Sequence, residues 1–508
     1  MNLLFSASIF SFFTIISRIL GYLRDILIAI FLGTSIYADA FFVAFRLPNT
    51  FRRLFAEGTF NAAFIPSYTG AQLESKKKGK IFADEILSLL IFILLFVVTL
   101  AEIFTPFFVY VIAPGFLEND IKFGLAVEFA RITFPFLLFV SLSSFFSGIL
   151  NSNNKFAAAA AAPIILNLVL IGSILVSYIQ NYNFAKQLSY GVTIAGILQL
   201  IFLVYFTNKF YKPNLKFFFK LSPRIKFFFR KLLPSIFSSG VTQINILVGT
   251  IIASFQTGAV SYLYYADRVY QINLAIAGIA VGTVSLPVLS RAFKSKNFTE
   301  VTEIQNKSIE LSLLLSIPAS LGLTIASEEI ISGLFGYGAF NLKDIEMTSK
   351  ALIFFGYGIV AFALVKVLAN FFFARNDTKT PLYISLLIVF LNIVISLSFF
   401  EQLGFIIVPI ATTISTWIGV LVYLYILIKK KFLLLKKKLF INFFKMVLAS
   451  TIMSITLMFS IKKYSTYLDY NYTYKLFNLF IVVGLVGIVY LLSCYLLGLL
   501  KIKSYKTN

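Results

Sequence analysis

The chain has 508 residues, of which 59% are hydrophobic and only 13% are charged, and its mean hydropathy is +0.90. About a quarter of the residues of a soluble domain are charged, so this composition excludes an ordinary soluble protein. The net charge is +23, from 44 Lys and Arg against 21 Asp and Glu. There is no His and only one Cys, Cys494, which excludes His-ligated metals, intramolecular disulfides and cysteine-cluster metal sites.

Apolar runs long enough to cross a membrane recur along the whole chain, which predicts a polytopic all-α membrane protein. The first run is interrupted by charged residues, which argues against a cleavable signal peptide. We predict about fourteen spanning helices, near residues 7–32, 37–66, 83–113, 122–150, 157–180, 186–207, 230–254, 259–290, 305–332, 347–374, 380–400, 405–428, 438–461 and 473–500.

Basic residues gather in alternate loops between these spans, most densely at 76–80, 208–230 and 429–438. The loops between them are short, polar or acidic, as at 117–120. By the positive-inside rule, the basic loops and both termini are cytoplasmic. This distribution also explains the net charge, so we expect no nucleic-acid partner.

The sequence repeats itself at an interval of about 225 residues. Tyr37-Ala38-Asp39 recurs as Tyr265-Ala266-Asp267, and Gly58-Thr59 recurs as Gly282-Thr283. Six spans fit this interval, so the halves share one orientation, and a substrate site is expected between them. The predicted domains are a six-helix lobe (1–207), a basic amphipathic cytoplasmic linker (208–230), a second six-helix lobe (231–430) and two appended helices (431–508).

Charged side chains interrupt the first two apolar runs. An Arg at bilayer depth costs at least ~2.5–3.5 kcal/mol, so such residues are expected to face water, a partner or a substrate. We also expect Gly21 and Gly33 to loosen the first helix and Pro48 to kink the second. The residues concerned therefore predict the wall of a polar cavity: Arg18, Arg24, Asp25, Asp39 and Arg52.

Three motifs carry a family resemblance: SRILGYLRD at 17–25, ADAFFVAFRLPNTFRRLFAEGTFNAAFIP at 38–66, and YYADRVYQ at 264–271 followed by GIAVGTVSLP at 278–287. They resemble the MurJ/MviN family, the lipid II flippases of bacterial peptidoglycan synthesis, which belong to the MOP exporter superfamily. The resemblance runs in order from Met1 to about Lys430. The two appended helices are similar to that family's lipid-tail groove.

The resemblance implies a transporter of the bacterial inner membrane, not an enzyme, working by alternating access and needing no cofactor or metal. Its substrate would be lipid II, an undecaprenyl-diphosphate carrying a disaccharide-pentapeptide. Membrane lipids and cell-wall synthesis proteins would be its other partners. Some relatives have Glu where this chain has Gln271. The positions implied as functional are Ser17, Arg18, Arg24, Asp25, Asp39, Arg52 and Arg268.

We assign four arginines to substrate binding: Arg18, Arg24, Arg52 and Arg268. For Arg24 and Arg268 the reason is that guanidinium forks match phosphate oxygens two at a time. The assignment of Arg52 follows from the resemblance, and its alternative is an anchor at the inner leaflet. The alternative is that Arg24 pairs with Asp25, and Arg268 with its neighbour Asp267, as structural pairs. Neighbours on a helix point about 100° apart, so we expect these pairs to be poor.

Ser17, Asp25 and Asp39 are assigned to gating and charge pairing. Asp25 either neutralises Arg18 in one state only or has a static role. Asp39 either interacts with the dipole at a helix N-terminus, as the repeat at Asp267 suggests, or pairs with a cation as a gate. Outside this set, we expect a Glu128–Arg131 pair and interhelical hydrogen bonds from Asn167 and Asn392.

Three other functions stay open at this point. Two belong to the same superfamily: a flippase for another polyprenyl-linked oligosaccharide, and a cation-coupled drug exporter. The third is a membrane scaffold that recruits cell-wall synthases. The chain has no phosphate-binding loop motif, so ATP is not the direct driver, and the coupling ion or membrane potential is left open.

Overall fold

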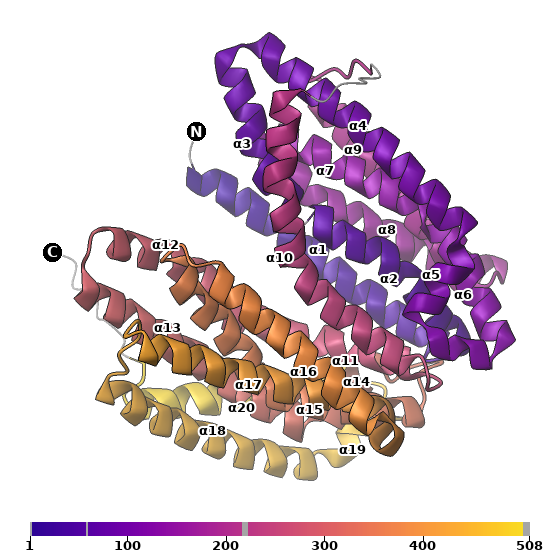
Figure 1. The fold of residues 1–508 in the computed structure, drawn as a ribbon. Helices are drawn as coiled ribbons and strands as arrows, with labels where there is room; N and C mark the ends of the chain where they lie inside the picture. The colour runs from indigo at the N-terminus through magenta and orange to yellow at the C-terminus, as the bar shows by residue number, and fades with distance from the viewer. Residues whose placement is uncertain (1–2, 57–58, 216–221, 501–508) are drawn as a thin grey trace. The chain divides into compact units, whose positions relative to one another are not determined.

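The computed structural model describes residues 3–56, 59–215 and 222–500, and every regular element in these ranges is helical (Figure 1). Ten candidate membrane spans are found among the described residues. One of them, Lys379–Lys429, contains two helices joined by a short turn. The predicted all-α membrane fold is confirmed, and the count of fourteen spans stays a prediction.

The chain forms two compact units, Met1–Ser261 and Tyr262–Asn508. The helices of the first unit are α1 (Leu3–Leu32), α2 (Ile36–Ala56), α3 (Thr59–Glu74), α4 (Lys76–Ile103), α5 (Thr105–Ile112), η1 (Pro114–Glu118), α6 (Asp120–Thr133), α7 (Pro135–Ser152), α8 (Phe156–Gln180), α9 (Phe184–Thr207) and α10 (Pro223–Ala253).

The second unit begins at Tyr262, within α11 (Ala259–Leu274). It continues through η2 (Ala275–Ala280), α12 (Val281–Lys294), α13 (Phe298–Ile325), α14 (Ser327–Phe335), α15 (Leu342–Phe373), α16 (Lys379–Leu403), η3 (Gly404–Ile406), α17 (Ile407–Lys429), α18 (Lys437–Lys463), α19 (Ser465–Leu468) and α20 (Lys475–Leu496).

In the first unit, α8 packs against α1 and α9, and α2 packs against α6 and α7. A core of buried aromatic rings joins α3, α4 and α7. Phe64 is at its centre, within 6.0 Å of the Phe82 ring and 5.1 Å of the Phe145 ring. Helix α10 packs against α2, α3, α4 and α5, so it is part of this unit, although the sequence placed 231–430 in the second lobe.

The basic linker is anchored on the start of α4. The Tyr211 hydroxyl donates to Asp84 Oδ1 at 2.6 Å, and the Asn214 amide donates to the same oxygen at 3.0 Å. Burial and the Asp84 carboxylate raise the pKa of Tyr211, which keeps its hydroxyl a donor. Residues 216–221 lie outside the described part of the linker, and α10 already begins at Pro223.

The helix is continuous at two of the positions, Gly21 and Pro48, where we expected it to be loosened or kinked. Helix α1 runs through Gly21 and ends at Leu32, and the φ of 54° at the following Gly33 needs the freedom of glycine. Helix α2 runs through Pro48 to Ala56. In contrast, the predicted span 259–290 is interrupted by the π-helix η2, which the apolar pattern did not indicate.

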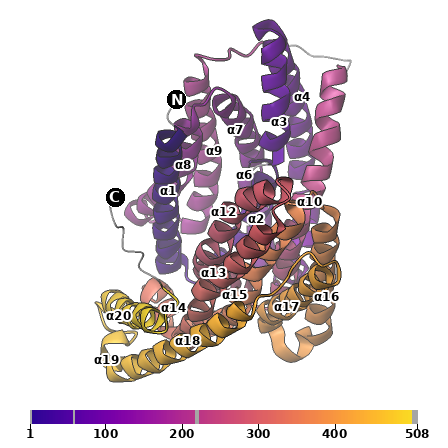
Figure 2. The same cartoon turned by 90° about the vertical axis from the view of Figure 1, so that its left-hand side faces the viewer.

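In the second unit, α15 packs against α13 and α17, and α16 packs against α17. The two appended helices α18 and α20 lie side by side, and α18 also packs on α13 (Figure 2). Their contact buries Met453, Val486 and Cys494. The predicted pair of C-terminal helices is therefore present and attached to α13.

Gly115 in η1 gives the first testable prediction. Its amide donates to Ser254 Oγ at 3.0 Å, and a Cβ there would lie 2.4 Å from the Phe255 backbone. Backbone cannot yield as a side chain can, so Gly115→Ala should separate η1 from the end of α10 and lower the thermal stability of the purified protein. Gly124→Ala on α6 is the matched control, because no atom lies within 4 Å of that Cβ position. Equal melting temperatures for the two variants would contradict the prediction.

Candidate functional site

The first polar cluster surrounds Arg24 in the second half of α1. Arg24 is 5% exposed, and its Nε and Nη2 atoms donate to Asp25 Oδ1 at 3.0 and 2.6 Å. Its Nη1 atom donates to Asn167 Oδ1 on α8 at 2.9 Å. The guanidinium is therefore held on two sides by an acid and an amide.

Asn167 connects this cluster to the backbone of α1. Its Nδ2 donates to the carbonyl of Ser17 at 2.9 Å. Gly21 lies beside this amide: a Cβ there would be 3.5 Å from Asn167 Nδ2, an ordinary van der Waals distance. The predicted interhelical role of Asn167 is confirmed, and Ser17 takes part through its main chain.

The Arg24–Asp25 ion pair corrects the expectation that these neighbours are poor partners. The 100° between adjacent positions describes where the side chains leave the helix. An Arg side chain is long enough for its guanidinium to reach a neighbouring carboxylate. With Asp25 only 1% exposed, a low local dielectric favours that contact over separation of the charges.

The structure does not bring Arg18 or Arg52 into this cluster. Arg18 is exposed on α1. Arg52 is half-buried on α2, and its Nε donates to Asn49 Oδ1 at 2.9 Å. Of the predicted residues, Ser17, Arg24 and Asp25 form one cluster.

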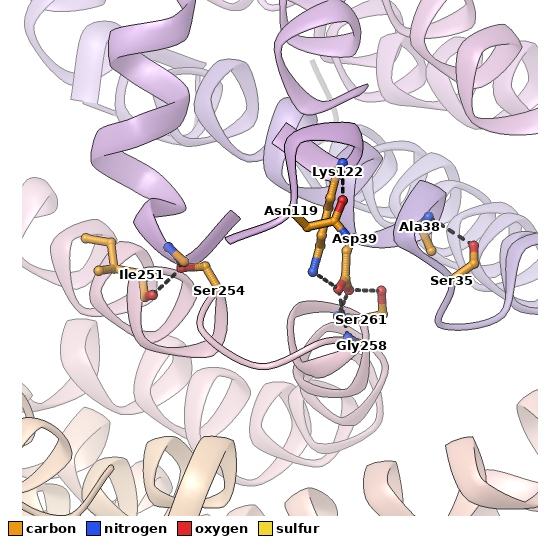
Figure 3. A network of polar contacts seen from close by, with 10 residues as sticks. Ser35, Ala38, Asp39, Asn119, Lys122, Ile251, Ser254, Gly258 and Ser261 are labelled. Carbon is orange, nitrogen blue, oxygen red and sulfur yellow. Dashed lines mark hydrogen bonds and ion pairs between the residues drawn. The ribbon is translucent and has the colours of Figure 1, made fainter. Parts of the chain in front are cut away.

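A second cluster surrounds Asp39, in the first turn of α2 (Figure 3). Its side chain is fully buried and pairs with Lys122 Nζ of α6 at 2.6 Å. The Ser261 hydroxyl and amide donate to Asp39 Oδ1 at 2.6 and 3.0 Å, and the Gly258 amide donates to Oδ2 at 2.9 Å. One carboxylate thus joins α2, α6 and the turn between α10 and α11.

The N-terminus of α11 is a favourable place for this carboxylate. The first amides of a helix lack intrahelical acceptors and carry partial positive charge. Lys122 completes the site: it is 4% exposed, and its ammonium lies 4.0 Å from the centre of the Phe116 ring. Asp39 therefore lies in the first turn of its own helix α2, accepts hydrogen bonds at the N-terminus of α11, and pairs with a cation.

Sequence reasoning missed Lys122, Gly258 and Ser261. Lys122 follows the acidic loop 117–120, and a lysine that begins a predicted span was the available signal. Gly258, with φ of 78°, precedes α11 and marks a turn. Neither signal identifies Asp39 as the partner, because 83 residues separate it from Lys122 and 222 from Ser261.

The second unit holds Arg268 on α11. Its Nη2 donates to the Tyr264 hydroxyl at 2.9 Å, and the guanidinium lies 5.0 Å from the Tyr264 ring centre. Asp267 accepts a hydrogen bond from Gln271, one turn further on. Asp267 is in the interior of α11, so the repeat does not support a helix N-terminal role for Asp39.

The π-helix η2 follows directly after α11, one turn beyond Gln271. Its Ala277 carbonyl accepts from Ser312 Oγ at 3.0 Å, and the Gly282 carbonyl just after it accepts from Asn370 Nδ2 at 2.8 Å. π-Helical segments inside α-helices are frequent at functional sites. Arg268 thus lies on a helix whose regular hydrogen bonding stops within two turns.

The structure also shows the partners of Glu128 and Asn392. Glu128 pairs with Lys186 of α9 at 2.7 Å, in place of the Arg131 expected from helical spacing. Asn392 donates to Thr412 Oγ1 of α17 at 3.2 Å, which confirms its interhelical role.

A family model described as "Lipid II flippase MurJ" matches residues 28–478. A probable lipid II flippase MurJ of Rickettsia prowazekii (strain Madrid E) is 38% identical, covering 93% of this chain and 92% of that protein. One from Buchnera aphidicola subsp. Acyrthosiphon pisum (strain APS) is 32% identical over the full length of both.

Solved structures give the same result for the fold. A lipid II flippase MurJ in an inward closed conformation matches with a TM-score of 0.81 and 29% identity, covering 96% of this chain and 98% of that chain. A multidrug resistance MATE family transporter of the MOP superfamily in an inward-facing conformation matches with a TM-score of 0.67, covering 80% and 93%. At 15% identity, the second match concerns the fold alone.

Proposed function

The chain belongs to the MurJ family of lipid II flippases, and we propose that its intramembrane arginines bind the lipid II diphosphate as the head group crosses the membrane. The observation that carries the function is the match to these flippases along nearly the whole chain. The protein is a transporter, and its substrate is lipid II.

Arg18, Arg24, Arg52 and Arg268 are the proposed substrate-binding residues. A diphosphate is a compact anion, and a guanidinium can give it two parallel hydrogen bonds where an ammonium acts as a point charge. The contacts of Arg24 place a condition on diphosphate binding. Its donors already serve Asp25 and Asn167, so diphosphate binding must displace at least one of them.

Asp25 is therefore proposed as the charge that holds Arg24 between transport events. An ion pair that is exchanged for substrate keeps the guanidinium from being buried without a partner. This differs from the pairing with Arg18 considered from the sequence. Ser17, whose carbonyl accepts from Asn167 Nδ2, would fix the position of Asn167, the second hydrogen-bond acceptor of Arg24.

Asp39 is proposed as a gate. Its bonds reach Gly258 and Ser261, where the chain passes from the first compact unit into the second. Breaking one buried carboxylate site would release α11 from α2 and α6 together. Because several charge-assisted hydrogen bonds meet at one carboxylate, they would form and break together, which gives the gate a closed and an open state.

The proposed location is the bacterial cytoplasmic membrane, with both termini and the basic loops on the cytoplasmic side. We expect a Cys replacing Lys78 to be labelled only from inside, and one replacing Tyr472 only from outside, in a Cys494→Ser background. Membrane-impermeant maleimide on intact cells, with permeabilised cells as the control, measures this. External labelling at residue 78 would overturn the orientation.

Cell-wall synthesis proteins are proposed partners of the cytoplasmic loops. Co-purification of synthases with the wild-type chain, and its loss when the four lysines of 76–80 are changed to Gln, would support this. Unchanged co-purification would contradict it.

The function is tested with the full chain in liposomes that contain lipid II. We expect the protein to move lipid II to the opposite leaflet, measured by accessibility to an added enzyme that modifies its head group. Depletion in the native host should make lipid II accumulate. Accumulation of another polyprenyl-linked sugar, with no lipid II movement in liposomes, would overturn the proposal.

A further inference from the structure

A groove runs between α16 and α17 in the second unit, at the end where α16 begins and α17 finishes. Its volume is about 640 Å³. None of the proposed substrate or gate residues lines it. The lining residues are Thr380, Tyr383, Ile384, Leu387, Val422, Tyr425, Ile426, Lys429 and Lys430.

The inner part of the groove is apolar. Ile384 is buried at its floor, and Leu387, Val422 and Ile426 are half-buried. The surrounding span, Lys379–Lys429, has only 22% of its apolar window buried, the smallest share among the candidate spans of the described residues. At bilayer depth the medium that covers such a surface is lipid hydrocarbon, so an acyl chain is the occupant that fits this part.

The mouth of the groove is polar and basic. Tyr383 and Tyr425 are 66% and 62% exposed there, as is typical of tyrosines at the level of lipid head groups. Lys429 is the last residue of α17, and Lys430 and Lys431 follow it, with all three side chains exposed. The mouth therefore combines two phenol hydroxyls with a run of three ammonium groups.

Most of this positive charge is available to a ligand. Lys430 lies 3.9 Å from Asp377 Oδ2, a long and solvent-accessible ion pair that contributes little. Asp377 already accepts from the Thr380 amide and hydroxyl, at 3.0 and 2.7 Å. Lys429 Nζ lies 3.4 Å from the Tyr425 hydroxyl and has no carboxylate within 4.0 Å in the part of the chain that the structure describes.

We propose that this groove binds an anionic glycerophospholipid, with its phosphate between Lys429 and Lys430 and one acyl chain in the apolar part. A lipid whose head group has no net charge would bind more weakly, because its own cationic group would face the same lysines. The groove shares no lining residue with the positions proposed to bind lipid II. It makes a membrane phospholipid a structural ligand of α16 and α17.

Native mass spectrometry of the delipidated full-length protein tests this proposal, with phosphatidylglycerol and phosphatidylethanolamine of identical acyl chains. The wild type should bind phosphatidylglycerol about tenfold more tightly. Lys429→Gln with Lys430→Gln should lose roughly tenfold or more of that affinity, since each basic residue near an anionic lipid contributes about fivefold. Val422→Trp should fill the apolar part and weaken binding of both lipids.

The matched control is Lys462→Gln with Lys463→Gln, another adjacent lysine pair at the end of a spanning helix. Lys463 lies 5.7 Å from the Tyr464 ring centre, much as Lys429 lies 5.5 Å from that of Tyr425. This control should bind phosphatidylglycerol as the wild type does. Equal losses in the two double variants would show non-specific attraction and overturn the proposal.

Two other outcomes would also overturn it. Equal affinity of the wild type for both phospholipids would exclude selection by charge. Displacement of phosphatidylglycerol by equimolar undecaprenyl phosphate would assign the groove to the polyprenyl substrate. The Lys429 and Lys430 side chains are exposed, so their replacement should leave the fold intact, and circular dichroism checks this for every variant.

Discussion

Arg24→Ala is expected to lower the amount of folded protein in the membrane and to abolish lipid II transport. The substitution leaves the Asp25 carboxylate, 1% exposed, without its ion-pair partner. Breaking a buried pair from one side costs ~3–5 kcal/mol, a large part of the stability of a typical domain. The measurements are membrane abundance by immunoblot and transport in liposomes at equal protein content.

A second variant separates stability from transport. Arg24→Ala with Asp25→Asn removes both charges, so membrane abundance should return close to the wild-type amount. Transport should stay abolished, because no guanidinium is left to meet the diphosphate. If the double variant transports lipid II as the wild type does, Arg24 has only a structural role. Arg24→Lys, which keeps the charge but not the fork, should keep part of the activity.

The helical pattern could be predicted from the sequence because each span is a local property. An apolar run needs no knowledge of its neighbours to become a helix in a membrane, where every backbone group must be satisfied internally. Phe156–Gln180 and Phe184–Thr207 accordingly agree with the predicted 157–180 and 186–207. The two appended helices were predictable for the same reason.

Interruptions within a span could not be predicted. Gly21 and Pro48 are local signals of weakness, yet α1 and α2 continue through them. At Gly21 the helix packs closely on Asn167 of α8. The π-helix η2 has no breaker at its start. Its Ala277 carbonyl accepts from Ser312 of α13, and the Gly282 carbonyl just after it accepts from Asn370 of α15. These partners are known only after the helices have packed.

For the candidate site, sequence identified the charged residues but not their pairing. Arg24, Asp25 and Asp39 could be identified as candidate site residues because a charged side chain inside a membrane span is costly. Their partners lie far along the chain or at unexpected angles. Arg24 reaches its neighbour because its side chain is long, and Asp39 meets Lys122 through tertiary packing. Spacing on one helix also gave the wrong partner for Glu128, which pairs with Lys186 on another helix.

The proposed gate at Asp39 predicts a change in accessibility. Asp39→Asn leaves the Lys122 ammonium buried without an anion while the gate is closed, whereas an open gate would let it reach water. A penalty of ~3 kcal/mol on the closed state alone would shift the equilibrium by roughly 100-fold. We therefore expect a buried position beside the gate to become accessible.

Ala38, fully buried next to Asp39, is the reporter. In a Cys494→Ser background, Ala38→Cys should react with external maleimide at least tenfold faster when Asp39→Asn is added. Ala449→Cys, equally buried in α18, is the control for general unfolding and should not change. Adding Lys122→Met removes the stranded charge and should slow labelling again. If Ala38→Cys and Ala449→Cys accelerate together, Asp39 stabilises the fold and is not a gate.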